Sequence, residues 1–120
     1  IMLITGPNTG GKTVTMKSAG LITVMALSGI PVPCDETSDI GAFTGVYADI
    51  GDEQSIEQNL SSFSGHLKNI KEILEKVTKN SLILLDELGS GTDPIEGAAF
   101  AMSVIDYLKS RKAKVIISTH

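Results

Sequence analysis

Apolar residues follow two alternating patterns along the chain. Short unbroken apolar runs predict buried strands, and longer segments with apolar positions three and four residues apart predict helices. The predicted strands cover residues 1–4, 46–50, 82–85 and 115–117, and the predicted helices cover residues 12–28, 62–78 and 94–111. Because helices alternate with continuous apolar strands, the order predicts an α/β fold with a mostly parallel sheet and flanking helices on both faces.

The helix ends carry recognisable start and stop residues. Gly29 follows the first helix, and Pro94 opens the last one at a position where its missing N–H costs nothing. In the first helix, Val14, Leu21 and Met25 mark the helical spacing. The second helix has a clearer apolar stripe, formed by Phe63, Leu67, Ile70, Ile73, Leu74 and Val77.

Composition bounds the kind of molecule. The 120 residues are 42% hydrophobic, which fits one compact domain, and they carry a net charge of −4 without a lysine or arginine cluster. This charge argues against the segment itself gripping a nucleic-acid backbone. The single cysteine, Cys34, excludes an internal disulfide and suits a reducing compartment. No apolar run approaches 18 residues, so we expect a cytoplasmic location and no membrane partner.

Domain organisation is predicted from the ends of the chain. The sequence begins on the first predicted strand and stops directly after the last one. We therefore expect residues 1–120 to form a single but incomplete domain, excised from a longer protein.

The clearest chemical motif is Gly6-Pro7-Asn8-Thr9-Gly10-Gly11-Lys12-Thr13, which completes the pattern G-x-x-x-x-G-K-[ST] directly after a strand. Glycines permit a turn whose N–H groups point inward at a phosphate. The start of the next helix faces the same anion, Lys12 is predicted to reach the outer phosphates, and Thr13 is predicted to bind Mg²⁺. The alternative is a glycine-rich turn with a solvated lysine.

Two adjacent carboxylates follow the apolar strand 82–85. Ligands of open α/β sheets bind at the carboxyl ends of strands, so we expect Asp86 beside the glycine motif. Asp86 is the predicted Mg²⁺ ligand, and Glu87 is predicted to polarise the water that attacks the γ-phosphate. The alternative is a helix-capping pair or a solvated strand end.

Three further segments narrow the class of phosphate-binding protein. They are the glycine-rich turn 88–94, the segment Ser118-Thr119-His120 and the hydroxyl-rich helix start 59–66. Their order is typical of an ATPase that closes two copies head-to-tail around ATP. In that reading Ser61 and Ser62 donate to the partner's γ-phosphate, Asp93 lies in a loop crossing the seam, and His120 is a γ-phosphate sensor. Alternatively, the serines and aspartate are helix caps and the histidine is structural.

With these motifs in place, the whole chain resembles the ATPase domain of the MutS-type DNA mismatch-repair and recombination proteins, within the P-loop ABC class of ATPases. The family's P-loop is similar to residues 6–13, its Walker B region to 84–92, its histidine switch to 118–120 and its Ser-Thr-Phe signature to Ser61-Ser62-Phe63. The chain lacks the Leu-Ser-Gly-Gly signature expected of a transporter or SMC-type ABC ATPase. An ABC transporter subunit would also need a membrane partner.

Within this family, residues 8–11, 48–58 and 91–99 look like the second bacterial MutS branch. That branch is associated with suppressing recombination and, in some members, with rescuing collided ribosomes. The mismatch-repair branch is expected to have paired aspartates near Gln54 and Ser55, and Met-Glu-Met where this chain has Ser64-Gly65-His66-Leu67. The DNA-reading regions and the nuclease module of the second branch have no counterpart in these residues.

The resemblance implies an ATP-hydrolysing homodimer with ATP and Mg²⁺ as ligands. Nucleotide-driven dimerisation would control how regions outside this segment bind branched or mismatched DNA or a ribosome, and the parent protein would also be an endonuclease. Gln54 would act as a Q-loop residue linking the γ-phosphate to the rest of the protein, or else be an ordinary turn residue. The alternative function is a non-catalytic, ATP-switched binding module of the mismatch-repair branch.

Overall fold

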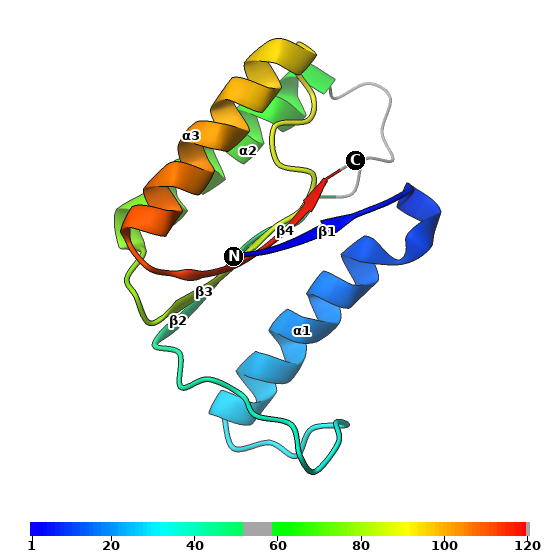
Figure 1. Ribbon diagram of the computed structural model, residues 1–120, viewed down its shortest axis with the longest axis vertical. Coiled ribbons are helices and arrows are strands. Elements are labelled where there is room, and N and C mark those ends of the chain that lie inside the picture. The colour runs from blue at the N-terminus through cyan, green and yellow to red at the C-terminus, as the bar shows by residue number, and fades with distance from the viewer. Residues whose placement is uncertain (52–58, 120) are drawn as a thin grey trace.

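The computed structural model describes residues 1–51 and 59–119, which form a parallel sheet between helices (Figure 1). Four parallel strands lie in the order β1-β4-β3-β2. In chain order, the strands are β1 Met2–Thr5, β2 Gly45–Asp49, β3 Ser81–Leu85 and β4 Lys114–Thr119, and the helices are α1 Lys12–Leu27, α2 Asn59–Lys76 and α3 Pro94–Ser110. The predicted α/β class and parallel sheet are therefore confirmed.

The two faces of the sheet are covered unequally. Helices α2 and α3 lie on one face, where Ile83, Leu85, Val115 and Ile117 are almost fully buried. Their partners are mainly apolar residues of these two helices, Ile70, Ile73, Val104 and Leu108, together with Val77, which directly follows α2. On the other face α1 contributes only Met16 to a smaller cluster with Leu82 and Leu84. Most of the hydrophobic stabilisation therefore comes from the α2 and α3 side.

The buried face of α1 differs from the one that its apolar spacing suggests. Val14 and Leu21 are 67% and 62% exposed. The buried positions are instead Lys12, Met16, Gly20 and Thr23. A Cβ built on Gly20 would lie 2.5 Å from Leu84 Cδ1, so the missing side chain lets α1 approach the sheet closely. Because apolar residues surround most of this helix, the spacing of apolar positions alone does not identify the face that packs on the sheet.

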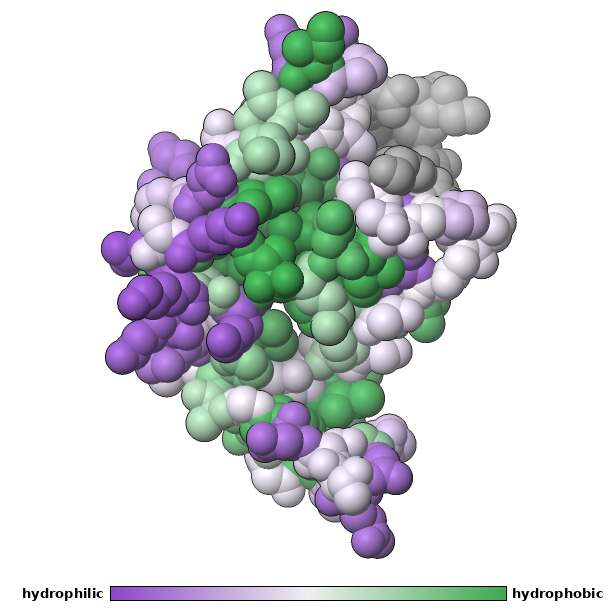
Figure 2. Space-filling view, viewed as in Figure 1, coloured by the Kyte–Doolittle hydropathy of each residue, from purple (hydrophilic) through white to green (hydrophobic). Residues whose placement is uncertain are grey.

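Strand β1 is an edge strand and remains partly uncovered. Among the described strands it pairs with β4 alone, and Ile1, Met2 and Leu3 are each at least half exposed. Figure 2 shows apolar side chains gathered at the centre of the face on which Figure 1 places the N-terminus and β1. The carboxyl end of this strand nevertheless lies at the same end of the sheet as those of the other strands, and the site described below lies there.

In the part of the chain that the structure describes, no helix combines the length and apolar character needed to cross a membrane.

The loop after β3 contacts α3 backbone to backbone. Gly89 has a left-handed φ of +86°, and a Cβ added to it would lie 2.3 Å from the carbonyl oxygen of Gly97. A Cβ on Gly97 would lie 2.1 Å from the carbonyl oxygen of Gly89. Neither distance is sterically possible, so glycine is required at both positions to bring the loop this close to the helix.

Replacing Gly97 with alanine is expected to destabilise the protein by about 1–3 kcal/mol, because the added methyl group overpacks a backbone contact. The matched control is Gly65→Ala in α2, where a Cβ would meet nothing within 4 Å. This control is expected to stabilise the protein by about 0.5–1 kcal/mol through helix propensity. Urea unfolding of both variants measures the difference, and a Gly97→Ala variant with the parent midpoint would show that the contact does not form.

Candidate functional site

The loop of residues 6–13, here called the glycine loop, leaves open space at the end of β1. Gly6 and Gly11 have left-handed φ values of +138° and +76°. Between them a 3-10 turn over Asn8–Gly10 is closed by the Gly10 N–H, which donates to the Pro7 carbonyl at 3.0 Å. A Cβ added at Gly6, Gly10 or Gly11 would meet nothing within 4 Å. The loop thus presents unobstructed backbone next to the first turn of α1, where helical N–H groups lack partners within the helix.

Lys12 is the first residue of α1 and is only 4% exposed. Its ammonium group donates to the carbonyl oxygens of Gly6, at 2.6 Å, and of Thr119 at the end of β4, at 3.1 Å. An ammonium group has three donors, so these two contacts orient it and leave one for a ligand in the loop. The alternative of a solvated lysine is wrong for this structure.

Asp86 lies at the point where three elements meet. It is 7% exposed, and its Oδ2 accepts a hydrogen bond of 2.7 Å from the hydroxyl of Thr13 in α1. Its Oδ1 accepts a hydrogen bond from the hydroxyl of Ser118 in β4. The structure therefore brings the two predicted metal ligands, Thr13 and Asp86, into contact. A buried carboxylate with both oxygens bound is also not a solvated strand end.

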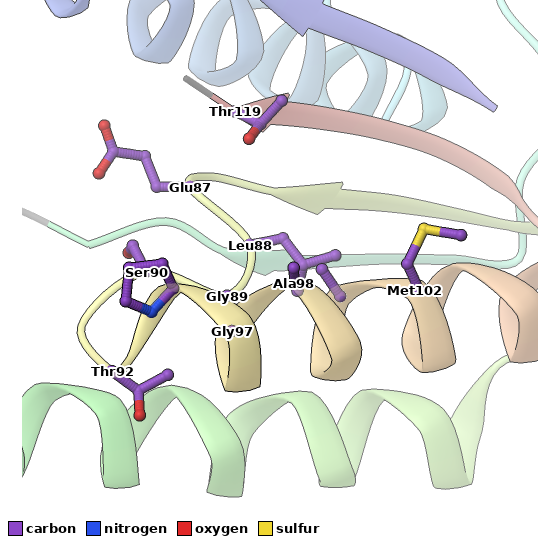
Figure 3. A pocket seen from close by; sticks show the side chains of 11 residues that line it. Glu87, Leu88, Gly89, Ser90, Thr92, Gly97, Ala98, Met102 and Thr119 are labelled. Carbon is purple, nitrogen blue, oxygen red and sulfur yellow. The ribbon is translucent and has the colours of Figure 1, made fainter.

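Glu87 adopts an uncommon backbone conformation for a residue with a side chain. Its φ is +51°, and its N–H donates to Ser118 Oγ at 2.9 Å. Conformations of this kind persist where the surroundings enforce them, and they cluster at functional sites. The side chain lies beside a cavity of about 620 Å³ between the following loop and α3. Figure 3 shows that Leu88 points toward α3 whereas Glu87 points away from it.

Ser118 is a residue that the motif analysis did not assign. Its side chain is fully buried, donates to Asp86 and accepts from the Glu87 N–H. The segment Ser118-Thr119-His120 was singled out for its histidine alone. The sequence signal that indicates a role for Ser118 is a hydroxyl at the end of a largely apolar strand, because a buried polar group of this kind needs hydrogen-bond partners.

The other predicted residues are separated from this cluster or fall outside the description. Asp93 caps α3, because its carboxylate accepts the N–H groups of Ile95, at 2.9 Å, and Glu96, at 3.2 Å. Ser61 and Ser62 lie in the first turn of α2. Gln54 and His120 are outside the described residues, as are the side chains of Asn8, Ser61 and Ser62. The predicted roles of these residues therefore stay predictions.

Comparison with known proteins gives a consistent result. The family described as MutS domain V matches residues 2–120. The chain is 78% identical over 120 residues to Endonuclease MutS2 of Fusobacterium nucleatum, covering 100% of this chain and 15% of that protein. It is 61% identical over 119 residues to Endonuclease MutS2 of Clostridium botulinum strain Loch Maree, covering 99% of this chain and 15% of the relative.

The chain thus spans about 15% of the length of the curated relatives that it matches. Nearly every residue takes part in the family match, and these relatives carry the name of the second branch expected from the sequence. The chain belongs to the MutS domain V family.

Proposed function

We propose that this chain binds and hydrolyses MgATP as the P-loop, ABC-type ATPase domain of a MutS2-like protein. One observation carries the proposal. The ammonium of Lys12, the hydroxyl of Thr13 and the carboxylate of Asp86 converge beside a glycine loop with open space. A cation, a hydroxyl and a carboxylate at a helix N-terminus are the groups that a metal-bound triphosphate requires.

The glycine loop fits the phosphates of the substrate. Space for them exists where Cβ atoms are missing at Gly6, Gly10 and Gly11. Backbone N–H groups of the loop and of the first turn of α1 would donate to the phosphate oxygens. The remaining donor of Lys12 would reach the β- and γ-phosphates, held in place by the Gly6 and Thr119 carbonyls.

The donor set around Asp86 fits Mg²⁺. Thr13 and Asp86 supply oxygen atoms, which Mg²⁺ prefers. Thr13 Oγ1 and Asp86 Oδ2 are 2.7 Å apart, so one ion could contact both. Among the described residues no three histidine, cysteine or acidic side chains gather, which suits a metal held largely by substrate phosphates and water. Bound Mg²⁺ would neutralise charge on the phosphates. Ser118 would keep the carboxylate of Asp86 oriented.

Glu87 is the proposed general base. Glu87 directly follows Asp86, and its backbone N–H is held by Ser118 Oγ, which supports a place beside the predicted metal ligand. There it would accept a proton from the attacking water. His120 would contact the γ-phosphate, since it follows Thr119, whose carbonyl already holds Lys12. Gln54 would serve as the Q-loop residue.

The complete site is proposed to form between two copies in a head-to-tail homodimer. The first turn of α2, with Ser61 and Ser62, would donate to the γ-phosphate bound by the partner, and Asp93 would lie at the seam. ATP-driven closure would then control how other regions of the protein grip branched DNA or a ribosome. The relatives are named endonucleases, and we propose that nuclease activity belongs to regions outside this chain. We place the protein in the cytoplasm, supported by a single cysteine that cannot form an internal disulfide.

Glu87→Gln is expected to lower steady-state ATP hydrolysis at least about 100-fold, because the water loses its base. Phosphate contacts remain, so the variant is expected to accumulate as an ATP-bound dimer. Light scattering with and without MgATP measures this change in mass. Lys12→Ala is the matched control and is expected to stay monomeric, because it loses the phosphate contact.

Two results would contradict this proposal. Hydrolysis by Glu87→Gln at the parent rate would remove the base assignment. A monomeric Glu87→Gln variant at saturating MgATP would remove the composite dimer site.

Ser118→Ala is expected to lower kcat about 10-fold to 100-fold, because outer-sphere partners of metal ligands have effects of this size. The Mg²⁺ concentration for half-maximal activity is expected to rise, whereas ATP binding without metal should not change. Ser103→Ala on the exposed side of α3 is the control. The measurement is activity against Mg²⁺ concentration for both variants. Coincident curves for Ser118→Ala and Ser103→Ala would exclude a positioning role for Ser118.

A further inference from the structure

A second buried polar cluster lies at the end of β2. The carboxylate of Asp49, the last residue of this strand, is bound by two side chains of α2. Its Oδ2 is 2.7 Å from His66 Nδ1, and its Oδ1 accepts a hydrogen bond of 2.9 Å from Asn69 Nδ2. The side chain of Asp49 is 8% exposed and that of His66 is 30% exposed. Because a carboxylate accepts hydrogen bonds, Nδ1 of His66 is the protonated ring nitrogen.

This cluster attaches α2 to the strand at a defined position. His66 and Asn69 are three residues apart and therefore project from the same side of the helix. Asn69 Nδ2 also donates to the Ala48 carbonyl at 3.0 Å. Apolar contacts further along α2 already hold the helix on the sheet. Hydrogen bonds to a buried carboxylate also fix the position and orientation of α2 on the sheet, because they are directional and apolar contacts are not.

The same aspartate also holds the strand end that carries the metal ligand. The carbonyl oxygen of Asp49 accepts the N–H of Asp86 at 2.9 Å. One residue therefore contacts α2 through its side chain and the Asp86 backbone through its main chain. A shift of α2 at His66 would be transmitted directly to the end of β3.

The contacts of α2 near His66 extend to its first turn. Ser61 and Ser62 lie about one turn before His66, and the ring of Phe63 meets Phe100 of α3 edge-on with centroids 6.1 Å apart. The His66 ring also fills the space beside Gly51, where an added Cβ would lie 2.9 Å from Cε1. The ring therefore lies in contact range of the residue that follows Ile50, about one turn after Ser61 and Ser62.

We propose that Asp49, His66 and Asn69 form a positioning cluster for ATP hydrolysis, in which His66 and Asn69 of α2 hold the carboxylate of Asp49. This inference rests on the proposed function. The first turn of α2 serves the partner's nucleotide, whereas Asp86 serves the chain's own metal. Each copy presents the first turn of α2 to its partner's nucleotide. The cluster fixes the position of that turn relative to Asp86 of the same copy, and it therefore links the two nucleotide sites of the dimer.

The test compares His66→Leu with His66→Asn in the full-length protein. Asparagine places an amide nitrogen at the position of Nδ1, whereas leucine has no donor. His66→Leu is expected to lower kcat at least about tenfold, because misplaced donors lose transition-state contacts. KM for MgATP is expected to change less than about threefold, since the glycine loop is untouched. His66→Asn is expected to keep at least about half of the parent kcat.

Lys68→Ala is the control, because Lys68 is exposed on the same helix between the two cluster residues. Parent kcat in His66→Leu would overturn the inference, and so would an equal loss in His66→Asn or a change confined to KM. If His66→Leu folds poorly, Asn69→Ala removes the other donor to Asp49 and is judged by the same two constants. Parent-level ATP turnover in Lys12→Ala would instead overturn the proposed function, whatever the His66 variants do.

Discussion

The geometry of the site depends on the buried carboxylate of Asp86. A carboxylate out of contact with water is costly unless both oxygens are bound. Here the hydroxyls of Thr13 and Ser118 bind them, and the Asp86 N–H is bound by the Asp49 carbonyl. These contacts come from α1, β4 and β2, so one side chain at the end of β3 draws together most elements of the fold. Because an unpaired buried carboxylate is costly, Asp86 is stable in this position only when α1, β4 and β2 bring their hydrogen-bonding groups to it.

The position of β4 explains why this convergence is possible. This strand follows the other three described strands in the sequence but lies between β1 and β3, and it pairs with both in parallel. Two consecutive residues at its end then reach both halves of the site, Ser118 through its hydroxyl and Thr119 through its carbonyl oxygen. Parallel pairings over such sequence separations are slow to form. The site is therefore assembled only when β4 has entered the sheet between β1 and β3.

The features that could be predicted from the sequence were local ones. Continuous apolar runs identified the strands, and the fixed spacing of residues 6–13 identified the glycine loop, because the relevant residues are neighbours in the chain. The buried face of α1 could not be read from spacing, since a gap at Gly20 decides it. Ser118 and Asp86 are 32 residues apart and their contact depends on strand order. The same holds for Asp49 and His66, whose contact depends on how α2 packs against β2.

The contact between Gly89, in the loop after β3, and Gly97, in α3, has a mechanical consequence. Side chains normally separate a loop from a helix and can yield when one of them moves. Where Gly89 meets Gly97 only backbone atoms touch, so at this contact no side chain lies between the loop and α3. A movement of the loop next to Glu87 would therefore reach the first turn of α3 without first rearranging a side chain at this contact.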